Sequence, residues 1–158
     1  MNLNIQIETH ETMHVAYIHH QGDYNDLEPV FDRLYERAAE AAISLDDKTE
    51  IFMLTYDDPN ITESRYLRAD IGVVIPDVAS KIGDLKVQTI SAGKYAVAHF
   101  KGVYGDLNQA YDWLYGRWLP DSGHEVDDRP AIEIYHNDPA KVLEKDLLTE
   151  IRIPLVIS

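Results

Sequence analysis

A carboxylate in the middle of a short apolar segment is the strongest chemical signal in this sequence. The segment is Ala131-Ile-Glu-Ile-Tyr-His136, and its alternation predicts a strand with Glu133 and Tyr135 on one face. Burying such a carboxylate without a partner is costly. A carboxylate among aromatic rings attracts organic cations, through charge pairing and cation–π contact. The alternatives are a glutamate at a sheet edge or in solvent, or one paired with an arginine.

The chain repeats itself at a spacing of 80 residues, which makes Glu133 more informative. Residues 14–37 match residues 94–117 at 10 of 24 positions. The counterpart of Glu133 is Met53, so the repeated architecture does not itself require an acid at this place. We interpret positions that the halves share as architecture, and positions where they differ as candidates for one ligand site.

Two further positions can be interpreted by the same comparison. Trp118 has Ala38 as its counterpart, and it is either a core residue of a helix or a contact for a ligand. Glu150 has another acid, Asp70, as its counterpart. Because both halves carry an acid here, we interpret this pair as structural or surface residues.

The histidines do not predict a metal site. The string His10-Glu-Thr-Met-His14 has the letters of a helical zinc motif, but it leads into a predicted strand. In an extended chain the two imidazoles would start roughly 13 Å apart, too far to share one ion. His19 and His99 are repeat partners, which favours an architectural role. The sequence also lacks nucleotide and dinucleotide fingerprints, so we expect no cofactor.

The composition is that of one soluble globular domain spanning residues 1–158. The net charge of −14 argues against a nucleic-acid or anionic-membrane surface, because phosphate contacts need clustered Lys and Arg. It is compatible with a cationic ligand or a basic protein partner. The absence of cysteine excludes disulfides and favours a cytoplasmic location. We find no signal-peptide pattern, and no apolar run near the roughly 20 residues that span a bilayer.

Each half reads as strand, helix, strand, strand. A stripe of apolar residues at helical spacing runs from Tyr24 to Ala38, and another from Tyr104 to Trp118. Pro29 requires the first helix to start close to it, and we expect Pro120 to stop the second helix soon after its stripe ends. The predicted strands are 14–20, 50–56 and 67–75 in the first half, and 94–100, 131–136 and 147–157 in the second.

This order predicts an α+β fold rather than a parallel, doubly wound sheet. We expect two βαββ units, about residues 14–75 and 94–155, that form antiparallel sheet with two long helices. A pseudo-two-fold axis would relate the units, and a central cavity at their junction would take a small ligand.

Several short runs occur in the order and spacing of a known family. The second half has Gly102-Val-Tyr104, Trp118-Leu-Pro-Asp-Ser-Gly123 and Arg129-Pro-Ala-Ile-Glu-Ile-Tyr135, and the first half has Gly22-Asp-Tyr24, Tyr56-Asp-Asp-Pro59 and Arg68-Ala-Asp70. On these runs nearly the whole chain resembles the GyrI-like (gyrase-inhibitor-like) effector-binding domains. That family includes a free-standing gyrase-modulating protein and the sensor domains of multidrug-responsive and AraC-type transcription regulators.

The resemblance implies which residues meet a ligand. In the family, the glutamate of the Pro-x-x-Glu-x-Tyr run lies in a central cavity and meets cationic, often aromatic, compounds; here that residue is Glu133. Trp118 is implied as a wall of the cavity. Tyr104 and Tyr24, which come after the glycines of the two halves, are further ligand-binding candidates.

We therefore expect a stand-alone protein that binds a hydrophobic, cationic small molecule, for sensing, sequestration or gyrase-inhibitor-like protection. One alternative is a hydrolase of reactive cyclopropane-type toxins, which some members of the family resemble; Glu133 would then act on water as the catalytic residue. Another is a protein-interaction role with gyrase as the partner. A third is the ligand-binding part of an AraC-type regulator, although the start at Met1 leaves no room for a helix-turn-helix.

Overall fold

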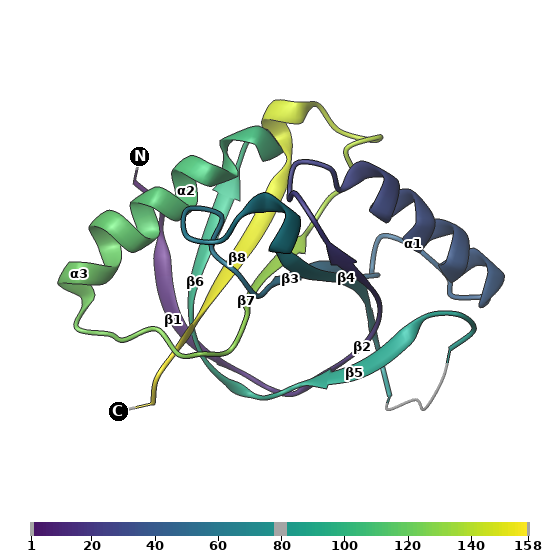
Figure 1. Cartoon of the computed structure of the whole chain (residues 1–158), viewed down its shortest axis with the longest axis horizontal. Helices are drawn as coiled ribbons and strands as arrows, with labels where there is room; N and C mark the ends of the chain where they lie inside the picture. Colours follow the sequence, from purple (N-terminus) through teal and green to yellow (C-terminus); the bar gives the residue numbers. More distant parts are fainter. Residues whose placement is uncertain (1, 78–81, 158) are drawn as a thin grey trace. The chain divides into compact units, whose positions relative to one another are not determined.

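The computed structural model describes residues 2–77 and 82–157, which belong to two compact units (Figure 1). Unit 1 comprises Met1–His10 and Gly93–Ser158, and unit 2 comprises Glu11–Ala92. Each unit combines helix with antiparallel sheet, so the expected α+β class is confirmed. Within the described ranges, no helix is long and apolar enough to cross a membrane.

Unit 2 has a sheet with α1 against it. In the described part of the unit, the strand order is β3 (Ile51–Thr55), β4 (Arg68–Ile75), β2 (Met13–Gln21) and β5 (Lys86–Ile90), with η1 (Ser64–Tyr66) leading into β4. Helix α1 (Glu28–Glu40) lies against β2 and β4. It buries Val30, Leu34 and Ala38, one face of a helical period. Pro29 lies in its first turn, as predicted, where the missing N–H has no partner to lose.

Unit 1 repeats this arrangement with a longer helical segment. Its described strands have the order β1 (Ile5–His10), β6 (Gly93–Lys101), β8 (Leu148–Leu155) and β7 (Ala131–Tyr135), with η4 (Glu144–Asp146) leading into β8. Ala96, Ala98, Phe100, Ile151 and Ile153 of the sheet form a core with the helical residues Leu107, Ala110 and Leu114. Each of the two repeats therefore folds as the predicted strand, helix, strand, strand series.

The sequence analysis missed β1 and β5, which are exchanged between the repeats. Strand β1 precedes the first repeat but pairs with β6 of the second. Strand β5 precedes the second repeat but pairs with β2 of the first. Each unit thus takes one edge strand from the stretch of chain that leads into the other repeat.

The prediction that Pro120 stops the second helix is wrong. The helical segment runs through η2 (Tyr104–Asp106), α2 (Leu107–Trp113), a π-helical turn η3 (Leu114–Trp118) and α3 (Leu119–Ser122). Proline removes the hydrogen bond to the carbonyl four residues earlier and its ring crowds that carbonyl. The wider π-helical turn lies immediately before α3, where this strain would fall. The segment ends at Gly123, whose φ of 76° is left-handed.

Candidate functional site

Glu133 is a buried carboxylate that two tyrosines hold. It lies on β7 with 4% of its surface exposed, opposite Ile151 of β8. Because Ile151 belongs to the core with α2, this register turns Glu133 toward the helix. Tyr111 of α2 donates its hydroxyl to Oε2 at 2.6 Å, and Tyr135 of β7 donates its hydroxyl to Oε1 at 2.8 Å. We call these three residues the Glu133 cluster.

Burial disfavours the charged form of Glu133, and the two tyrosine hydroxyls stabilise it. Burial raises the pKa of Glu133 above its ordinary value, and the hydrogen bonds from Tyr111 and Tyr135 oppose part of this rise. The pKa of Tyr111 is raised well above its usual range by burial of its hydroxyl and by the nearby Glu133 charge. Neither tyrosine hydroxyl carries a positive charge, so the cluster offers a carboxylate without a cation of its own.

The predicted shared face of Glu133 and Tyr135 is confirmed by their hydrogen bond. Tyr104, another candidate, joins the same group of residues through its ring. Its ring meets that of Tyr135 edge-on, at 5.5 Å between centroids and 67° between planes. Tyr104 is also 37% exposed, so a path of aromatic contacts runs from the surface to the buried carboxylate.

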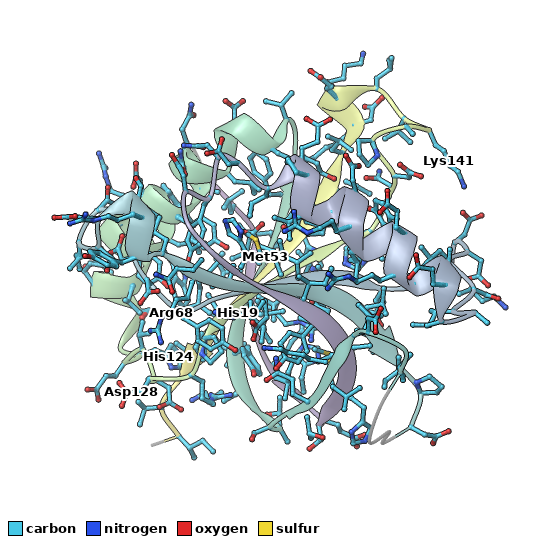
Figure 2. The ribbon with its side chains drawn as sticks, turned by 45° about the vertical axis from the view of Figure 1, so that its right-hand side comes forward. His19, Met53, Arg68, His124, Asp128 and Lys141 are labelled. Carbon is cyan, nitrogen blue, oxygen red and sulfur yellow. The ribbon has the colours of Figure 1, made fainter. Side chains whose placement is uncertain are left out.

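Trp118 and Tyr24 lie in different units. Trp118 packs against the core of unit 1 and stacks on His124, at 6.2 Å between ring centroids and 11° between planes. Figure 2 labels His124 and also Met53, the repeat counterpart of Glu133 on β3 of unit 2. Tyr24 belongs to unit 2, where its hydroxyl donates to the carbonyl of Arg68 and burial raises its pKa to about 12. That Trp118, Tyr104 and Tyr24 contact a ligand stays a prediction.

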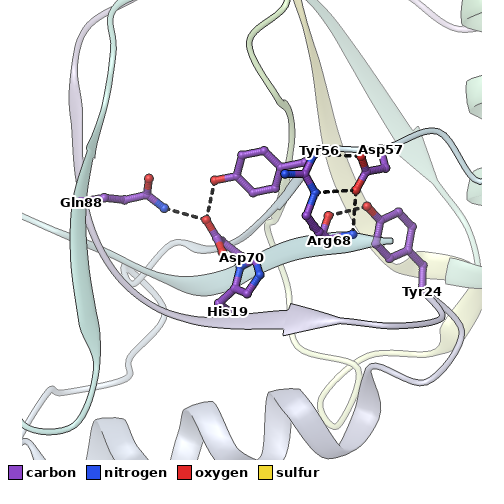
Figure 3. Close-up of polar contacts among 7 residues, drawn as sticks. All are labelled: His19, Tyr24, Tyr56, Asp57, Arg68, Asp70 and Gln88. Carbon is purple, nitrogen blue, oxygen red and sulfur yellow. Dashed lines mark hydrogen bonds and ion pairs between the residues drawn. The ribbon is translucent and has the colours of Figure 1, made fainter. Parts of the chain in front are cut away.

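A second carboxylate centre lies in unit 2, around Asp70 of β4. Asp70 is 3% exposed and accepts three hydrogen bonds from side chains (Figure 3). His19 Nδ1 lies 2.7 Å from Oδ1, while the Tyr56 hydroxyl and Gln88 Nε2 donate to Oδ2. Beside these groups is a pocket of about 320 Å³, lined by Tyr17, His19, Tyr56, Arg68, Asp70, Lys86 and Gln88.

Glu150, the counterpart of Asp70, is paired within unit 1. His136 Nε2 lies 2.9 Å from Oε1, and Arg152 Nε donates to Oε2. Burial alone would raise the pKa of Glu150, but the hydrogen bonds from Arg152 and His136 outweigh it and hold the pKa below its ordinary value. Both acids are buried, so the surface alternative in the sequence analysis is wrong for Glu150 and for Asp70.

The metal-like string of the sequence is not helical, as predicted. His10 ends β1 in unit 1 and lies 2.9 Å from Glu8, whereas His14 belongs to β2 in unit 2 and contacts Thr89. In the described ranges, no group of three or more His, Cys, Asp or Glu residues could hold a metal ion.

Sequence reasoning missed Tyr111 and the Asp70 centre, although the repeat contains a signal for each. Tyr111 has Phe31 as its counterpart, so it gains its hydroxyl only in the half that has Glu133. The halves differ again two residues after each acid: Arg152 stands two residues after Glu150, whereas Gly72 stands two residues after Asp70. If positions that differ between the repeats are compared in groups, rather than one at a time, they point to both the Glu133 cluster and the Asp70 centre.

The comparisons with known proteins agree with the fold and with one another. The model of the GyrI-like small molecule binding domain matches residues 3–156. Over 117 residues, the chain is 28% identical to a probable transcriptional regulator, YgiV, of Escherichia coli strain K12, covering 73% of each protein. Over 117 residues it is 30% identical to a DNA gyrase inhibitor of Pectobacterium carotovorum, covering 72% of this chain and 74% of the relative.

Two solved structures share the fold at low sequence identity. The C-terminal domain of EcmrR superposes with a TM-score of 0.83 at 18% identity, covering all of both chains. SAV2435, solved with tetraphenylphosphonium bound, superposes with a TM-score of 0.69 at 15% identity, covering 97% of this chain and 94% of the other.

Proposed function

Since the chain belongs to the GyrI-like family of small-molecule-binding domains, we propose that it binds a hydrophobic organic cation at Glu133. The observation that supports this is the Glu133 cluster: a carboxylate with 4% exposure, bonded by two neutral hydroxyls. A ligand cation would stabilise the charge that burial disfavours. The aromatic rings around it would add cation–π attraction.

In this proposal a ligand reaches Glu133 past the aromatic candidates of unit 1. Tyr104 has an exposed ring that contacts Tyr135, and Trp118 lies in the helical segment that includes Tyr111. We assign Tyr104 and Trp118, which belong to the same unit as Glu133, to the walls that receive the hydrophobic part of the ligand. The π-helical turn η3 lies between Tyr111 and α3, and π-helical turns occur often at functional sites.

The test uses two probes of one shape and opposite charge, tetraphenylphosphonium and tetraphenylborate. One similar structure was solved with tetraphenylphosphonium bound. Calorimetric titration should show that the wild type binds the cation and binds the anion far more weakly, because Glu133 attracts one and repels the other. Glu133→Gln keeps the shape and removes the charge. It should weaken the cation by roughly 1–3 kcal/mol, the Coulomb energy of two unit charges about 5–6 Å apart at an effective dielectric constant between about 80 and 20.

Glu133→Met supplies a matched variant, because Met53 occupies the same place in the other repeat. It should bind cation and anion with similar affinity. Glu150→Gln is the control for the loss of any buried acid of unit 1, and should retain the preference for the cation. Equal losses of cation and anion in Glu133→Gln would show that Glu133 does not select the charge, and would contradict the proposal.

A second candidate function is hydrolysis of a strained, electrophilic toxin, with Glu133 as the catalytic residue. The observation that favours it is the raised pKa of Glu133 beside two tyrosine hydroxyls, an arrangement suited to general acid–base work on water. Incubation with a cyclopropane-containing toxin, followed by mass spectrometry, separates the two functions. Hydrolysed product that disappears in Glu133→Gln, with binding of the toxin retained, would establish the enzyme; unchanged toxin would leave the binding function alone.

The biological role that we assign to binding is sensing or sequestration of the compound, in the cytoplasm. Gyrase is the protein partner to test, since several relatives are named DNA gyrase inhibitors and this chain carries a net charge of −14. A supercoiling assay with purified gyrase measures it directly. Inhibition that persists in Glu133→Gln would separate a protein-interaction role from ligand binding.

A further inference from the structure

Glu150 and its repeat counterpart Asp70 are both buried acids, but only Glu150 has an arginine two residues later in the sequence. In unit 1, Arg152 stands two residues after Glu150 on β8 and donates to its Oε2. Residues two apart in a strand share one face, so the arginine comes from the same face of the same strand. Arg152 is 8% exposed, beside Glu150, which is 7% exposed. Unit 1 therefore supplies its own cation to its buried acid.

Unit 2 has glycine in the place of that arginine. A Cβ atom on Gly72 would lie 2.1 Å from the carbonyl oxygen of Ala16 and 2.8 Å from the Cα of Tyr17. Both contacts are with backbone atoms of β2, which cannot move aside without disturbing the packed sheet. Because β2 and β4 approach so closely at Gly72, no side chain can stand there. Unit 2 therefore has no side chain at the position from which Arg152 reaches its acid in unit 1.

Asp70 keeps room for one more donor. A carboxylate has about four acceptor positions. Tyr56 and Gln88 donate to Oδ2, whereas His19 is the described partner of Oδ1. The pocket of about 320 Å³ lies against this carboxylate. This volume is at the small end of the range for small-molecule sites, which suits a ligand of one ring or a short chain.

The other lining groups suit a planar cation. Tyr17 and Tyr56 offer aromatic rings to a positive group. Arg68 also lines the pocket, with its guanidinium carbon 5.6 Å from the centroid of the Tyr56 ring. Its charge is paired with Asp57 at two points, at 3.0 Å for both Nε–Oδ2 and Nη2–Oδ1. Lys86 lies on β5 and is exposed. Its positive charge repels a cation in the pocket, so its removal can be used to test the proposal.

We propose that the pocket beside Asp70 binds the guanidinium, amidinium or ammonium group of a small molecule, which takes the role that Arg152 has in the other repeat. The site consists of residues of unit 2 and does not involve the Glu133 cluster of unit 1. Cation binding at Asp70 can therefore be tested independently of cation binding at Glu133. The protein would then recognise two cationic groups of different shape, one at each acid.

Three probes of nearly one shape test the proposal: benzamidinium, neutral benzamide and anionic benzoate. Titration of the full chain, followed by NMR, should show benzamidinium binding about 10- to 100-fold more tightly than benzamide, the ratio for hydrogen bonds to a charged group. The shifted amides should be those of Asp70 and Gly72 on β4 and of the neighbouring β5. Asp70→Asn should remove the preference for the cation.

Because Asp70 is buried and its variant could fail to fold, Lys86→Gln provides a second measurement at an exposed position. Removal of this repelling charge should raise the affinity for benzamidinium a few-fold. Glu144→Gln, at an exposed acid of unit 1, is the control, and should leave the benzamidinium shifts at Asp70 and Gly72 unchanged. The proposal is overturned if benzoate is the preferred probe, if Lys86→Gln weakens benzamidinium, or if benzamidinium shifts no amide near Asp70.

Discussion

Tyr111→Phe is the substitution that most directly tests the balance of charge in the Glu133 cluster. It removes the hydroxyl that donates to Oε2 at 2.6 Å and keeps the ring, and phenylalanine is the residue that the other repeat has at Phe31. A hydrogen bond to a charged group contributes about 1.5–3 kcal/mol. We expect the free energy of unfolding to fall by about this amount at neutral pH, because one oxygen of a buried carboxylate loses its donor.

The loss should depend on pH with a definite sign. Burial raises the pKa of Glu133 above its ordinary value of 4.5, and the bond from Tyr111 opposes that rise. Without the hydroxyl, the pKa of Glu133 in the folded state rises further. A raised pKa means that the folded state binds the proton more readily, so stability falls as pH rises from 4.5 through the folded pKa. The deficit of the variant should therefore be small in acid and complete at neutral pH.

Urea denaturation followed by the fluorescence of Trp113 and Trp118 measures this deficit. The same substitution is made in a Glu133→Gln background, to complete a double-mutant cycle. There Tyr111→Phe should have a smaller effect, about 1 kcal/mol, because the lost bond is between neutral groups. Tyr66→Phe, at a half-exposed ring of unit 2, is the control. Equal deficits in both backgrounds and at every pH would refute the reasoning.

Three further substitutions, and one control at Gly116, have defined outcomes. Trp118→Ala should lower both tetraphenylphosphonium affinity and the free energy of unfolding, the latter by less than the roughly 3–5 kcal/mol of a fully buried tryptophan because this ring is partly exposed. Arg152→Gln should destabilise the fold by about 3–5 kcal/mol at neutral pH. Since the pKa of Glu150 is held low, that pair stabilises above 4.5 and is lost as pH falls through the folded pKa, so acid denaturation curves should converge. Gly72→Ala should prevent close pairing of β2 with β4 and lower the melting temperature, whereas Gly116→Ala, with open space around its Cβ, should raise it slightly.

The repeat made much of the fold predictable. It aligned the strands and helices of the two halves, and the largely apolar runs of β3, β4, β7 and β8, which are buried on both faces, placed these strands within a few residues. The strands β1 and β5 were missed because they are short edge strands of six and five residues, and because both lie outside the stretches 14–75 and 94–155 that the repeat defined. Pro120 was misread because a local rule for α-helices does not anticipate a π-helical turn.

The site was predicted only as far as one strand could show it. Alternation put Glu133 and Tyr135 on one face, but Tyr111 arrives from a helix, and that packing depends on tertiary structure. The Asp70 centre draws residues from four strands, β2, β4, β5 and the end of β3, which no local pattern can bring together.

The exchange of β1 and β5 also sets an order of events during translation. All the strands described in unit 2 lie in one continuous stretch, Glu11–Ala92, so this unit can close as soon as that stretch leaves the ribosome. Unit 1 needs β1 from the beginning of the chain and β6 to β8 from its end, so β1 waits as an unpaired strand while the rest is made. If the gene were divided between the repeats, each product would lack one edge strand and carry the strand that the other lacks. We expect such fragments to be poorly folded when expressed singly, and to reassemble when expressed together.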